Sequence, residues 1–349
     1  MVECVRIGER FIGPGHPCFV IAEAGVNHNG ALGRALELVD AAKSARADAV
    51  KFQLYRVEEQ VSRAATTAAY QRERTGSSSM REMAESYDLP WDAHRDIAAH
   101  CRDVGIAYMA SCFDPQAIDF LLSLGGESIK IASGEITNCP LLAYAAKTGK
   151  PILLSTGMSS LEDVTGAVEH MRESGPSPLA LFHCVSDYPT EPRTANLRVM
   201  KTLADAFGVP VGFSDHTEGH AVAAAAVALG ACMIEKHFTV DKTLPGPDHA
   251  MSLAPRDFED FVAAVRSAEA ALGDGAKRVS AKELETRQIA RRSLVSRRDI
   301  EPGQSLDDEN VCLKRPATGI DPRDWRRARG RTARTRIPAD TPIAWEMLA

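Results

Sequence analysis

One pattern recurs eight times along this chain. A short run of apolar and β-branched residues is followed by a glycine or polar turn and then by apolar residues at helical spacing. This alternation is typical of βα units that build a parallel sheet. The eight runs begin at Cys18, Asp48, Ile106, Ser128, Pro151, Pro178, Pro210 and Cys232. Eight units over roughly 250 residues match a closed barrel, so we expect an α/β fold, a (β/α)8 TIM barrel.

A doubly wound open sheet is the competing architecture. It normally carries a glycine-rich phosphate-binding turn after its first strand, whereas this chain continues into EAGVNHNG with loosely spaced glycines. The polar segment 56–90 is longer than an ordinary connection, and we expect a functional loop over the barrel mouth. One helix is expected to begin at a Ser159 cap and to close on Gly175.

The pattern changes near residue 273. We expect a catalytic barrel over residues 1–273, a charged linker over 274–291 and a small, mostly β domain over 292–349. Turns with the sequences EPG and PAD interrupt the short strands of this last segment. A domain of this size is near the lower limit for independent folding, so we expect it to lean on a larger body.

Composition argues against several classes of function. The net charge of −6 gives no footprint for nucleic acid, and the arginine-rich run 323–336 is flanked by acidic segments, as on a solvated or subunit-contacting face. The longest apolar run, 221–234, is too short to cross a bilayer and predicts a buried helix followed by a strand. The N-terminus lacks a signal-peptide pattern. Eight cysteines without a CxxC pair favour a reducing cytoplasm, and we expect a cytoplasmic protein with no membrane partner.

Polar residues gather where the predicted strands end. The active site of a TIM barrel lies at the carboxyl ends of its strands, and residues two apart on a strand share a face. Such pairs are Lys51 and Gln53, Ser133 and Glu135, Ser214 and His216, and Glu235 and His237. A single polar residue at a strand end is most often a solvated terminus, but coincidence over many strands indicates a site.

His216 and His237 end neighbouring strands of the predicted barrel, so their imidazoles are expected to reach one divalent ion. Asp215, Glu235 and Asp248 would bring oxygen donors nearby. Two imidazoles leave several coordination positions open, which suits a catalytic Lewis acid such as Mn²⁺ better than a structural zinc.

A second group of donors is expected to surround one side of the mouth. Its members carry ammonium or hydroxyl groups and are Lys51, Lys130, Ser133, Ser155, Thr156 and Ser214. Such a ring suits a phosphate or carboxylate. Because a Walker-type GxxxxGK[ST] motif is missing from the sequence, a small anionic metabolite is favoured over a nucleoside triphosphate.

These residues lie in motifs that resemble the sialic acid synthase family, which condenses phosphoenolpyruvate with N-acetylmannosamine or related sugars. The motifs occur in order as IAEAGVNHNG, DAVKFQ, IKIASGEITN, PILLSTGMS, LFHCVSDYPT, VGFSDHT, EKHFTVDK and PGPDHAMSL, with RRSLV and LKRP in the tail. The resemblance implies a C-terminal antifreeze-like (SAF) domain. It also implies a domain-swapped homodimer in which this domain caps the partner subunit's active site.

The resemblance also assigns roles to individual residues. Phosphoenolpyruvate would contact Lys51, Ser111, Lys130, Ser133, Ser155, Ser186 and Ser214. The sugar would contact Glu23, Gln53, Tyr188, Asp248 and, from the partner subunit, Arg315. The metal would bind to His216 and His237, with Mn²⁺ favoured and Mg²⁺ or Co²⁺ as alternatives. Glu135 is expected to handle the proton, and Lys51, His216 and His237 complete the catalytic set.

The implied reaction forms a nine-carbon 2-keto-3-deoxy acid. C3 of phosphoenolpyruvate attacks the open-chain aldehyde, water adds at C2 with help from Glu135, and phosphate leaves by C–O cleavage. The acceptor stays open between N-acetylmannosamine, its 6-phosphate, precursors of legionaminic or pseudaminic acid, and a sugar of a secondary-metabolite pathway. A Schiff-base aldolase using Lys130 or Lys236, and a non-catalytic sugar-binding protein, are the rival hypotheses.

The chain departs from the family pattern at three places. It has Ser111 and Cys112 where Thr-Pro is common, and Ser186 where Asn or Thr is common. Arg74 stands where a neutral amide is frequent, which would fit either an acceptor with extra negative charge or a solvated loop. We expect the solvated loop.

Overall fold

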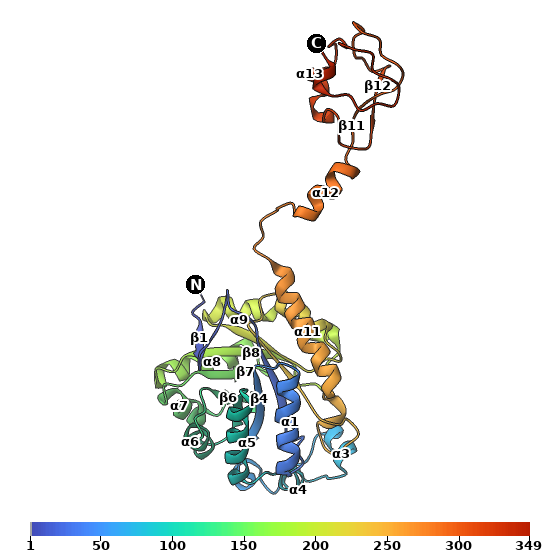
Figure 1. The fold of residues 1–349 in the computed structure, drawn as a ribbon. Helices are drawn as coiled ribbons and strands as arrows, with labels where there is room; N and C mark the ends of the chain where they lie inside the picture. The colour runs from blue at the N-terminus through green and yellow to red at the C-terminus, as the bar shows by residue number, and fades with distance from the viewer. Residues whose placement is uncertain (1) are drawn as a thin grey trace. The chain divides into compact units, whose positions relative to one another are not determined.

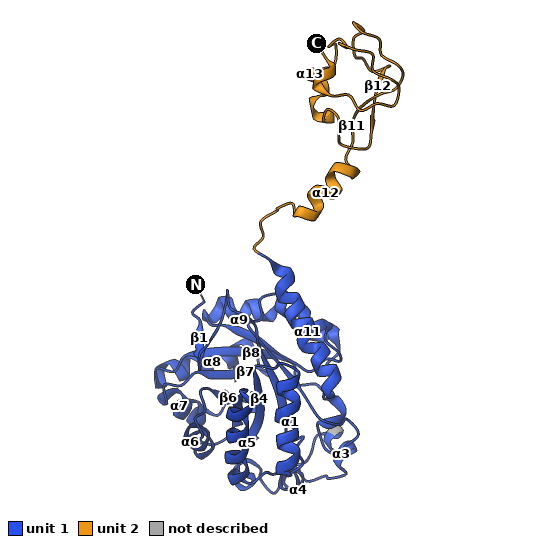
Figure 2. Cartoon of the chain, in the orientation of Figure 1, with its two compact units in different colours: residues 1–273 blue, residues 274–349 orange. Residues whose placement is uncertain are grey.

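The computed structural model describes residues 2–349, and these residues form two compact units, Met1–Gly273 and Asp274–Ala349 (Figure 2). Each unit has a hydrophobic cluster of its own.

The first unit contains a closed barrel of eight parallel strands, as the repeating pattern predicts (Figure 1). The strands are β3 (Phe19–Gly25), β4 (Ala49–Leu54), β5 (Ala107–Cys112), β6 (Ile129–Ile131), β7 (Ile152–Ser155), β8 (Leu179–Cys184), β9 (Val211–Asp215) and β10 (Met233–His237). The last strand, β10, pairs with both β9 and the first barrel strand, β3, so the sheet has no free edge.

Helices surround the strands on the outside of the barrel (Figure 1). They are α1 (Leu32–Ser44), α5 (Trp91–Val104), α6 (Pro115–Ser123), α7 (Cys139–Lys147), α8 (Leu161–Ser174), α9 (Val199–Phe207), α10 (Ala221–Ala228) and α11 (Pro255–Leu272). The apolar run expected to give a buried helix and then a strand forms α10 and β10. Apolar residues on the outer side of the strands pack with these helices in one large cluster.

The start of α8 differs by one residue from the prediction. Ser160, not Ser159, is the cap: its Oγ accepts a hydrogen bond from Asp163 N, and the Asp163 carboxylate accepts one from Ser160 N. This reciprocal pair satisfies two donors that a helix end otherwise leaves unpaired. Ser159 instead donates its hydroxyl to Gly157 O at 3.0 Å.

The inside of the barrel has an apolar floor. We call it the lower interior layer; its residues are Phe19, Ile21, Ala49, Met109, Leu153, Ala180, Phe182 and Met233. A short antiparallel hairpin, β1 (Val5–Ile7) and β2 (Arg10–Ile12), adds Val5, Ile7 and Ile12 to the same cluster. The hairpin therefore packs against the lower layer, opposite the strand ends that carry the predicted site.

The long segment 56–90 contains helices, which the sequence analysis did not predict. It carries α2 (Val57–Gln60), α3 (Ala69–Thr75) and α4 (Met80–Ser86). Val57 and Val61 pack with Val26 and Tyr55 in a small separate cluster. This packing ties the segment to the loop that follows β3.

The second unit is mostly irregular, with few regular elements. They are α12 (Ala281–Ala290), the antiparallel pair β11 (Ser293–Ser296) and β12 (Val311–Lys314), and α13 (Trp325–Ala328). Helix α12 falls in the segment expected as a charged linker, and none of its residues is buried. Leu294, Ile300 and Ile343 belong to the unit's hydrophobic cluster.

The arginine-rich run of the second unit is paired with acids of the same unit. Arg323 bonds Asp321 at 2.7 Å and Arg327 bonds Asp324 at 3.0 Å, and Arg336 pairs with Asp299. This local pairing fits the expected solvated face. None of the helices described within residues 2–349 has the length and apolar character that a membrane span requires.

Candidate functional site

Four charged side chains meet inside the barrel above the lower interior layer. Lys51 Nζ lies 2.6 Å from Glu23 Oε2 and 3.5 Å from Glu235 Oε2. Lys130 Nζ lies 3.4 Å from Glu235 Oε1. The four side chains come from β3, β4, β6 and β10, and each residue is at most 5% exposed. Glu235, which sequence analysis placed at a strand end as a possible oxygen donor near a metal, is thus the carboxylate that joins the two lysines.

Serine hydroxyls complete this cluster. Lys51 donates to Ser111 Oγ at 3.0 Å, and Lys130 donates to Ser155 Oγ at 2.7 Å. Ser214 donates to Glu235 Oε1 at 3.0 Å. We call the combined set the upper interior layer; it consists of Glu23, Lys51, Ser111, Lys130, Ser155, Ser214 and Glu235. The two-residue alternation of strands brings these side chains to one face, as the sequence predicts.

Burial and mutual attraction shift the pKa values of these groups in different directions. Burial raises the pKa of the Glu23 carboxyl to about 7, against the opposing attraction of Lys51. Burial also acts to raise the pKa of Glu235, but Lys130 and Lys51 together lower it to about 2. Burial lowers the pKa of Lys130, whereas Glu23 and Glu235 outweigh burial and raise that of Lys51. Glu235 is therefore the firmly ionised acid, and Glu23 exchanges a proton near neutral pH.

His216 and His237 come together as predicted. Their ring centroids are 5.6 Å apart, and the ring of Tyr188 lies 4.3 Å from that of His216. His216 Nδ1 lies 2.7 Å from Val185 O. A carbonyl oxygen can only accept a hydrogen bond, so Nδ1 carries the hydrogen and Nε2 of the neutral ring keeps its lone pair. His237 Nδ1 is buried and has no hydrogen-bond partner within residues 2–349. Burial lowers the pKa of both imidazoles, which favours the neutral form that binds metals.

The expected oxygen donors beside these histidines do not all face the mouth. Asp215 bonds Lys236 at 3.0 Å and Thr217 Oγ1 at 2.7 Å, and Lys236 also lies 5.7 Å from the ring of Phe261 on α11. Asp215 and Lys236 therefore point outward to the helices, because they alternate with the inward residues Ser214 and Glu235. Within residues 2–349, no three His, Cys, Asp or Glu side chains form a group that could hold a metal ion.

Glu23, Gln53 and Asp248 converge on Gly25 at the end of β3. A Cβ on Gly25 would lie 3.4 Å from Glu23 Oε1, 3.5 Å from Asp248 Oδ2 and 3.6 Å from Gln53 Nε2. Gly25 also has a φ of 53°, where side chains are disfavoured. Burial raises the pKa of the Asp248 carboxyl to about 6, against the attraction of Arg74.

Arg74 is not on a purely solvated loop, contrary to our expectation. It is half-buried, and it donates a hydrogen bond to Pro247 O at 2.9 Å, directly before Asp248. The packing of the helical segment 56–90 near the mouth explains the difference, because a free loop would have left this guanidinium in water.

Ser133, Ser186 and Cys184 crowd around Gly157. Ser133 Oγ accepts from Gly157 N at 2.9 Å and lies 3.2 Å from Cys184 Sγ. A Cβ on Gly157 would lie 2.9 Å from both of these side-chain atoms and closer still to Ser186 Oγ. Sequence analysis did not single out Gly157 or Cys184; the signal it could have used is the glycine inside a run of hydroxyl residues. Thr156, expected among the free donors, instead gives its hydroxyl to Phe182 O.

Glu135 lies in the 3-10 turn η1 (Ser133–Glu135) and is half-buried. Its Oε2 accepts a hydrogen bond from Asn138 Nδ2 at 2.7 Å, at the start of α7. Its Oε1 makes no hydrogen bond to the part of the chain that is described. Arg315 belongs to the second unit, where it is exposed and makes no ion pair within residues 2–349.

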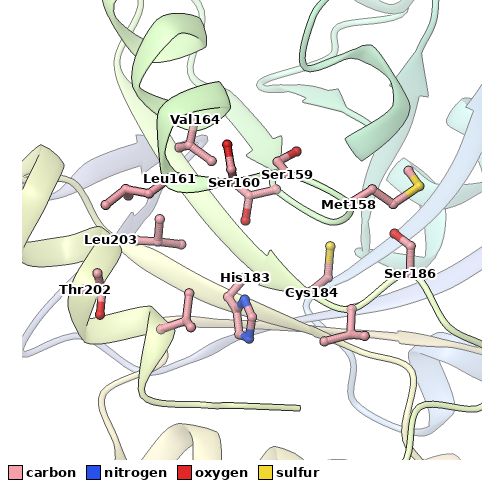
Figure 3. Close-up of a pocket in the computed structure, with 13 residues that line it drawn as sticks. Met158, Ser159, Ser160, Leu161, Val164, His183, Cys184, Ser186, Thr202 and Leu203 are labelled. Atoms are coloured by element: carbon pink, nitrogen blue, oxygen red, sulfur yellow. The ribbon is translucent and has the colours of Figure 1, made fainter. Parts of the chain in front are cut away.

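A cavity of about 650 Å³ opens beside the Ser186 side of the mouth (Figure 3). Ser186, Cys184 and Thr156 line it near the site together with His183 and Val185, and the remaining wall comes from α8, α9 and the loop before α8. Met158 and Leu161, which stand at this wall in Figure 3, are 74% and 49% exposed. The cavity is therefore mostly apolar, with hydroxyls at its edge.

Comparisons with known proteins identify the family of this chain. N,N′-diacetyllegionaminic acid synthase of Legionella pneumophila is 44% identical over 334 residues, which cover 94% of each chain. Human N-acetylneuraminate-9-phosphate synthase is 34% identical over 87% of this chain and 85% of that protein. The crystal structure of N-acetylneuraminic acid synthetase from Leptospira borgpetersenii, in complex with citrate, superposes with a TM-score of 0.72 at 34% identity, over 82% of this chain and 95% of that one. Residues 38–277 match the NeuB family and residues 291–349 match the SAF domain. The chain thus belongs to the NeuB family and carries a SAF domain at its C-terminal end.

Proposed function

We propose that this protein condenses phosphoenolpyruvate with an N-acylated hexosamine, or a related hexose, in its open-chain form. The products are inorganic phosphate and a nine-carbon 2-keto-3-deoxy acid of the sialic acid type. The upper interior layer is the observation that carries this proposal, since it concentrates two buried lysines and several hydroxyls at the barrel mouth. Synthases of legionaminic and sialic acids among the relatives support the same chemistry.

The upper interior layer suits an anion that carries several negative charges. Two lysines and two glutamates balance one another when both acids are ionised. Because the pKa of Glu23 is about 7, this carboxyl can take up a proton as an anion enters, which leaves an excess positive charge for the anion. We assign phosphoenolpyruvate to Lys51, Ser111, Lys130, Ser133, Ser155, Ser186 and Ser214.

The acceptor sugar is assigned to the neighbouring side of the mouth. Glu23, Gln53 and Asp248 converge there around Gly25, and the ring of Tyr188 lies against that of His216 at a tilt of 44°. These side chains offer hydrogen-bond acceptors and donors for sugar hydroxyls and an acetamido group. Glu23 borders both groups of residues, so the acceptor would lie beside the anion.

The residues at the ends of β9 and β10 fit a divalent ion. The orphaned His237 Nδ1 and the free lone pair of His216 Nε2 are donors that a metal would satisfy. We propose that His216 and His237 hold Mn²⁺, with Mg²⁺ or Co²⁺ as alternatives. When bound, such an ion supplies a Lewis acid for the carbonyl oxygen of the acceptor.

Glu135 is our candidate for proton handling. Asn138 holds its Oε2, so the carboxylate is oriented while Oε1 remains able to accept a proton from water. Gly157 N holds Ser133 Oγ two residues before this carboxylate. These fixed contacts would orient the water that adds to C2 of phosphoenolpyruvate.

We further propose a cytoplasmic homodimer in which the SAF domain of each chain covers the partner's barrel. Arg315, exposed and without an ion-pair partner within residues 2–349, would then complete the sugar site of the partner subunit. The eight cysteines all carry free thiols, which fits a reducing compartment. A cap that excludes water would strengthen the electrostatic contacts in the site.

A phosphate-release assay tests the proposal. Phosphoenolpyruvate labelled with ¹⁸O at the bridging oxygen is mixed with N-acetylmannosamine, its 6-phosphate, diacetamido-trideoxyhexoses and plain hexoses, with and without EDTA. We expect phosphate release with at least one acceptor, ¹⁸O in the phosphate because the C–O bond breaks, loss with EDTA and recovery with Mn²⁺. Absence of release across the panel would refute the function.

The aldolase hypothesis has one observation in its favour. Burial lowers the pKa of Lys130, as in lysines that form Schiff bases, whereas Lys236 faces away from the mouth. Borohydride reduction in the presence of pyruvate distinguishes the two reactions. A stable adduct at Lys130 would favour the aldolase, and no adduct is expected from the synthase.

A further inference from the structure

Two loops meet at the seam where the first and last barrel strands pair. The loop after β3 carries Asn29, and the loop after β10 carries Thr239 and His249. His249 Nε2 lies 2.8 Å from Asn29 Oδ1, and His249 Nδ1 lies 2.7 Å from Thr239 Oγ1. We call Asn29, Thr239 and His249 the seam latch. None of the three belongs to the groups assigned to substrate or metal above.

The hydrogen bonds of the seam latch have only one consistent arrangement for a neutral imidazole. Asn29 Nδ2 donates to Pro245 O at 2.7 Å, so Asn29 Oδ1 is left as an acceptor for His249 Nε2–H. His249 Nδ1 then carries a lone pair, so the hydroxyl of Thr239 donates to it at 2.7 Å rather than to Asp241 O, which lies farther away at 3.2 Å. Burial lowers the pKa of His249 to about 4, which keeps this neutral tautomer near pH 7. Each atom of the imidazole that can form a hydrogen bond is thereby used.

The backbone beside the seam latch is closely packed. Gly246 has a φ of +153°, and a Cβ there would lie 2.8 Å from His249 Cδ2 and 3.4 Å from Asn29 Oδ1. His249 itself is fully buried. Asn27 adds a second tie, because its Nδ2 donates to Phe238 O at 2.8 Å and to Ser252 Oγ at 2.9 Å. The two loops are therefore fixed to each other at several points.

Asp248 is attached directly to this fixed region. It precedes His249 in the chain, and its backbone oxygen accepts from Ser252 Oγ at 2.7 Å. On its other side, Arg74 holds Pro247 O. The Asp248 carboxylate reaches Gly25 on the acceptor side of the mouth, whereas the lysines of the upper interior layer are bonded to Glu23, Glu235, Ser111 and Ser155. A displacement of His249 would therefore move the acceptor side and leave the phosphoenolpyruvate side in place.

We propose that the seam latch positions the Asp248 carboxylate for the acceptor sugar, and so sets the acceptor affinity without touching either substrate. This inference rests on the proposed synthase function. The members of the seam latch are positioning residues. Their loss is expected to raise the KM for the acceptor while the KM for phosphoenolpyruvate stays nearly constant. Misplacement of a binding group by about 1 Å can cost on the order of 100-fold.

The test compares conservative variants of the seam latch in the full-length protein. His249→Asn cannot reach Asn29 Oδ1, whereas His249→Gln places an amide nitrogen near the position of Nε2. Asn29→Gly removes the side chain and keeps the left-handed φ of 48°. We expect His249→Asn and Asn29→Gly to raise the acceptor KM about 10- to 100-fold, and His249→Gln to stay within about 3-fold of wild type. The phosphoenolpyruvate KM should change less than about twofold in all three, because its residues are not displaced.

Further variants keep the test decisive. Thr239→Val retains the shape of the side chain, so it is expected to fold. It should raise the acceptor KM by about 3- to 10-fold, because His249 Nδ1 loses its hydrogen-bond donor. His94→Asn, at another buried histidine on the helix side of the barrel, is the control that should leave both KM values unchanged. The double variant Asn29→Gly with His249→Asn should be no worse than either single variant.

Three results would each have a different meaning or ground. The inference would be overturned if the latch variants had a lower melting temperature and a lower total activity but unchanged KM values for both substrates. The latch would then be purely structural. A wild-type protein that releases no phosphate with any acceptor would instead refute the proposed function. Equal rises in both KM values would also overturn the inference, since the acceptor side would not be controlled separately.

Discussion

The interior of the barrel changes from apolar to charged within two residues along the same strand. On β7, Leu153 packs in the lower interior layer, and Ser155 bonds Lys130 in the upper one. On β3, the same distance separates Ile21 from Glu23. Burying an apolar side chain stabilises a fold by about 1.5–3 kcal/mol, whereas a buried ion pair is often no better than an apolar pair of similar size. The comparison teaches that the lower layer stabilises the fold, while the upper layer holds charge for another purpose.

The largest expected effect comes from a lysine of the upper interior layer. Lys130→Met removes one of the two ammonium groups of this layer, and we expect kcat/KM for phosphate release to fall on the order of 10³-fold. Stability should change little, because Glu235 keeps its contacts with Lys51 and Ser214, and Glu23 can take up a proton near neutral pH. Steady-state kinetics and thermal unfolding measure the two quantities.

Lys236→Met is the matched control on the outer face of the barrel. Lys236 pairs with Asp215, and removal of one partner of a buried pair costs about 3–5 kcal/mol. We expect a lower melting temperature and nearly normal KM values in the protein that remains folded. The comparison between the layers would be broken if Lys236→Met lost activity as strongly as Lys130→Met without unfolding.

The next largest effect is expected from two variants on strand β7, one in each interior layer. Leu153→Ala empties part of the lower interior layer, and we expect a loss of about 2–5 kcal/mol in the free energy of unfolding, with unchanged KM values. Ser155→Ala should do the reverse, with little loss of stability and a rise in the phosphoenolpyruvate KM of about 10-fold or more. Urea unfolding followed by circular dichroism, and kinetics on both variants, would show the contrast. A Ser155→Ala protein with normal KM would remove this serine from the site.

Much of the fold could be predicted from the sequence, because the repeated alternation of strand and helix patterns can be recognised in short stretches of the chain. The same period placed Lys51 and Lys130 at one mouth, since strand alternation fixes the face of each residue. Local spacing did not reveal that Glu235 bridges these lysines, because the tilt and register of the closed barrel decide which side chains meet. It also missed the hairpin formed by β1 and β2, whose strands of three residues are too short to show a pattern.

A glycine at the rim of the upper interior layer gives a smaller effect. Gly157→Ala would bring a methyl group against Ser133, Cys184 and Ser186, and overpacking of this kind costs about 1–3 kcal/mol. We expect the phosphoenolpyruvate KM to rise about 10-fold as Ser133 and Ser186 are pushed away. Adding Ser186→Ala should recover part of the loss by relieving the contact. Failure of this rescue in kinetics would show that Ser186 is not the residue displaced.

The smallest effect concerns the outer side of the barrel, where a buried histidine lies beside the rings of Phe52 and Tyr108 and takes no part in the proposed site. His94 bonds the hydroxyl of Tyr108 at 3.0 Å, and burial lowers its pKa to about 4. The unfolded chain binds the proton near pH 6.5, so the stability due to neutral His94 is present above this pH and is lost as the pH falls towards 4. His94→Asn should therefore reduce the slope of unfolding free energy between pH 5 and 6 by about 1.4 kcal/mol per pH unit. Urea titrations at several pH values measure this slope. Parallel plots of unfolding free energy against pH for the variant and the wild type would mean that His94 is protonated in the folded barrel. The outer side of the barrel would then hold charge, as the upper interior layer does.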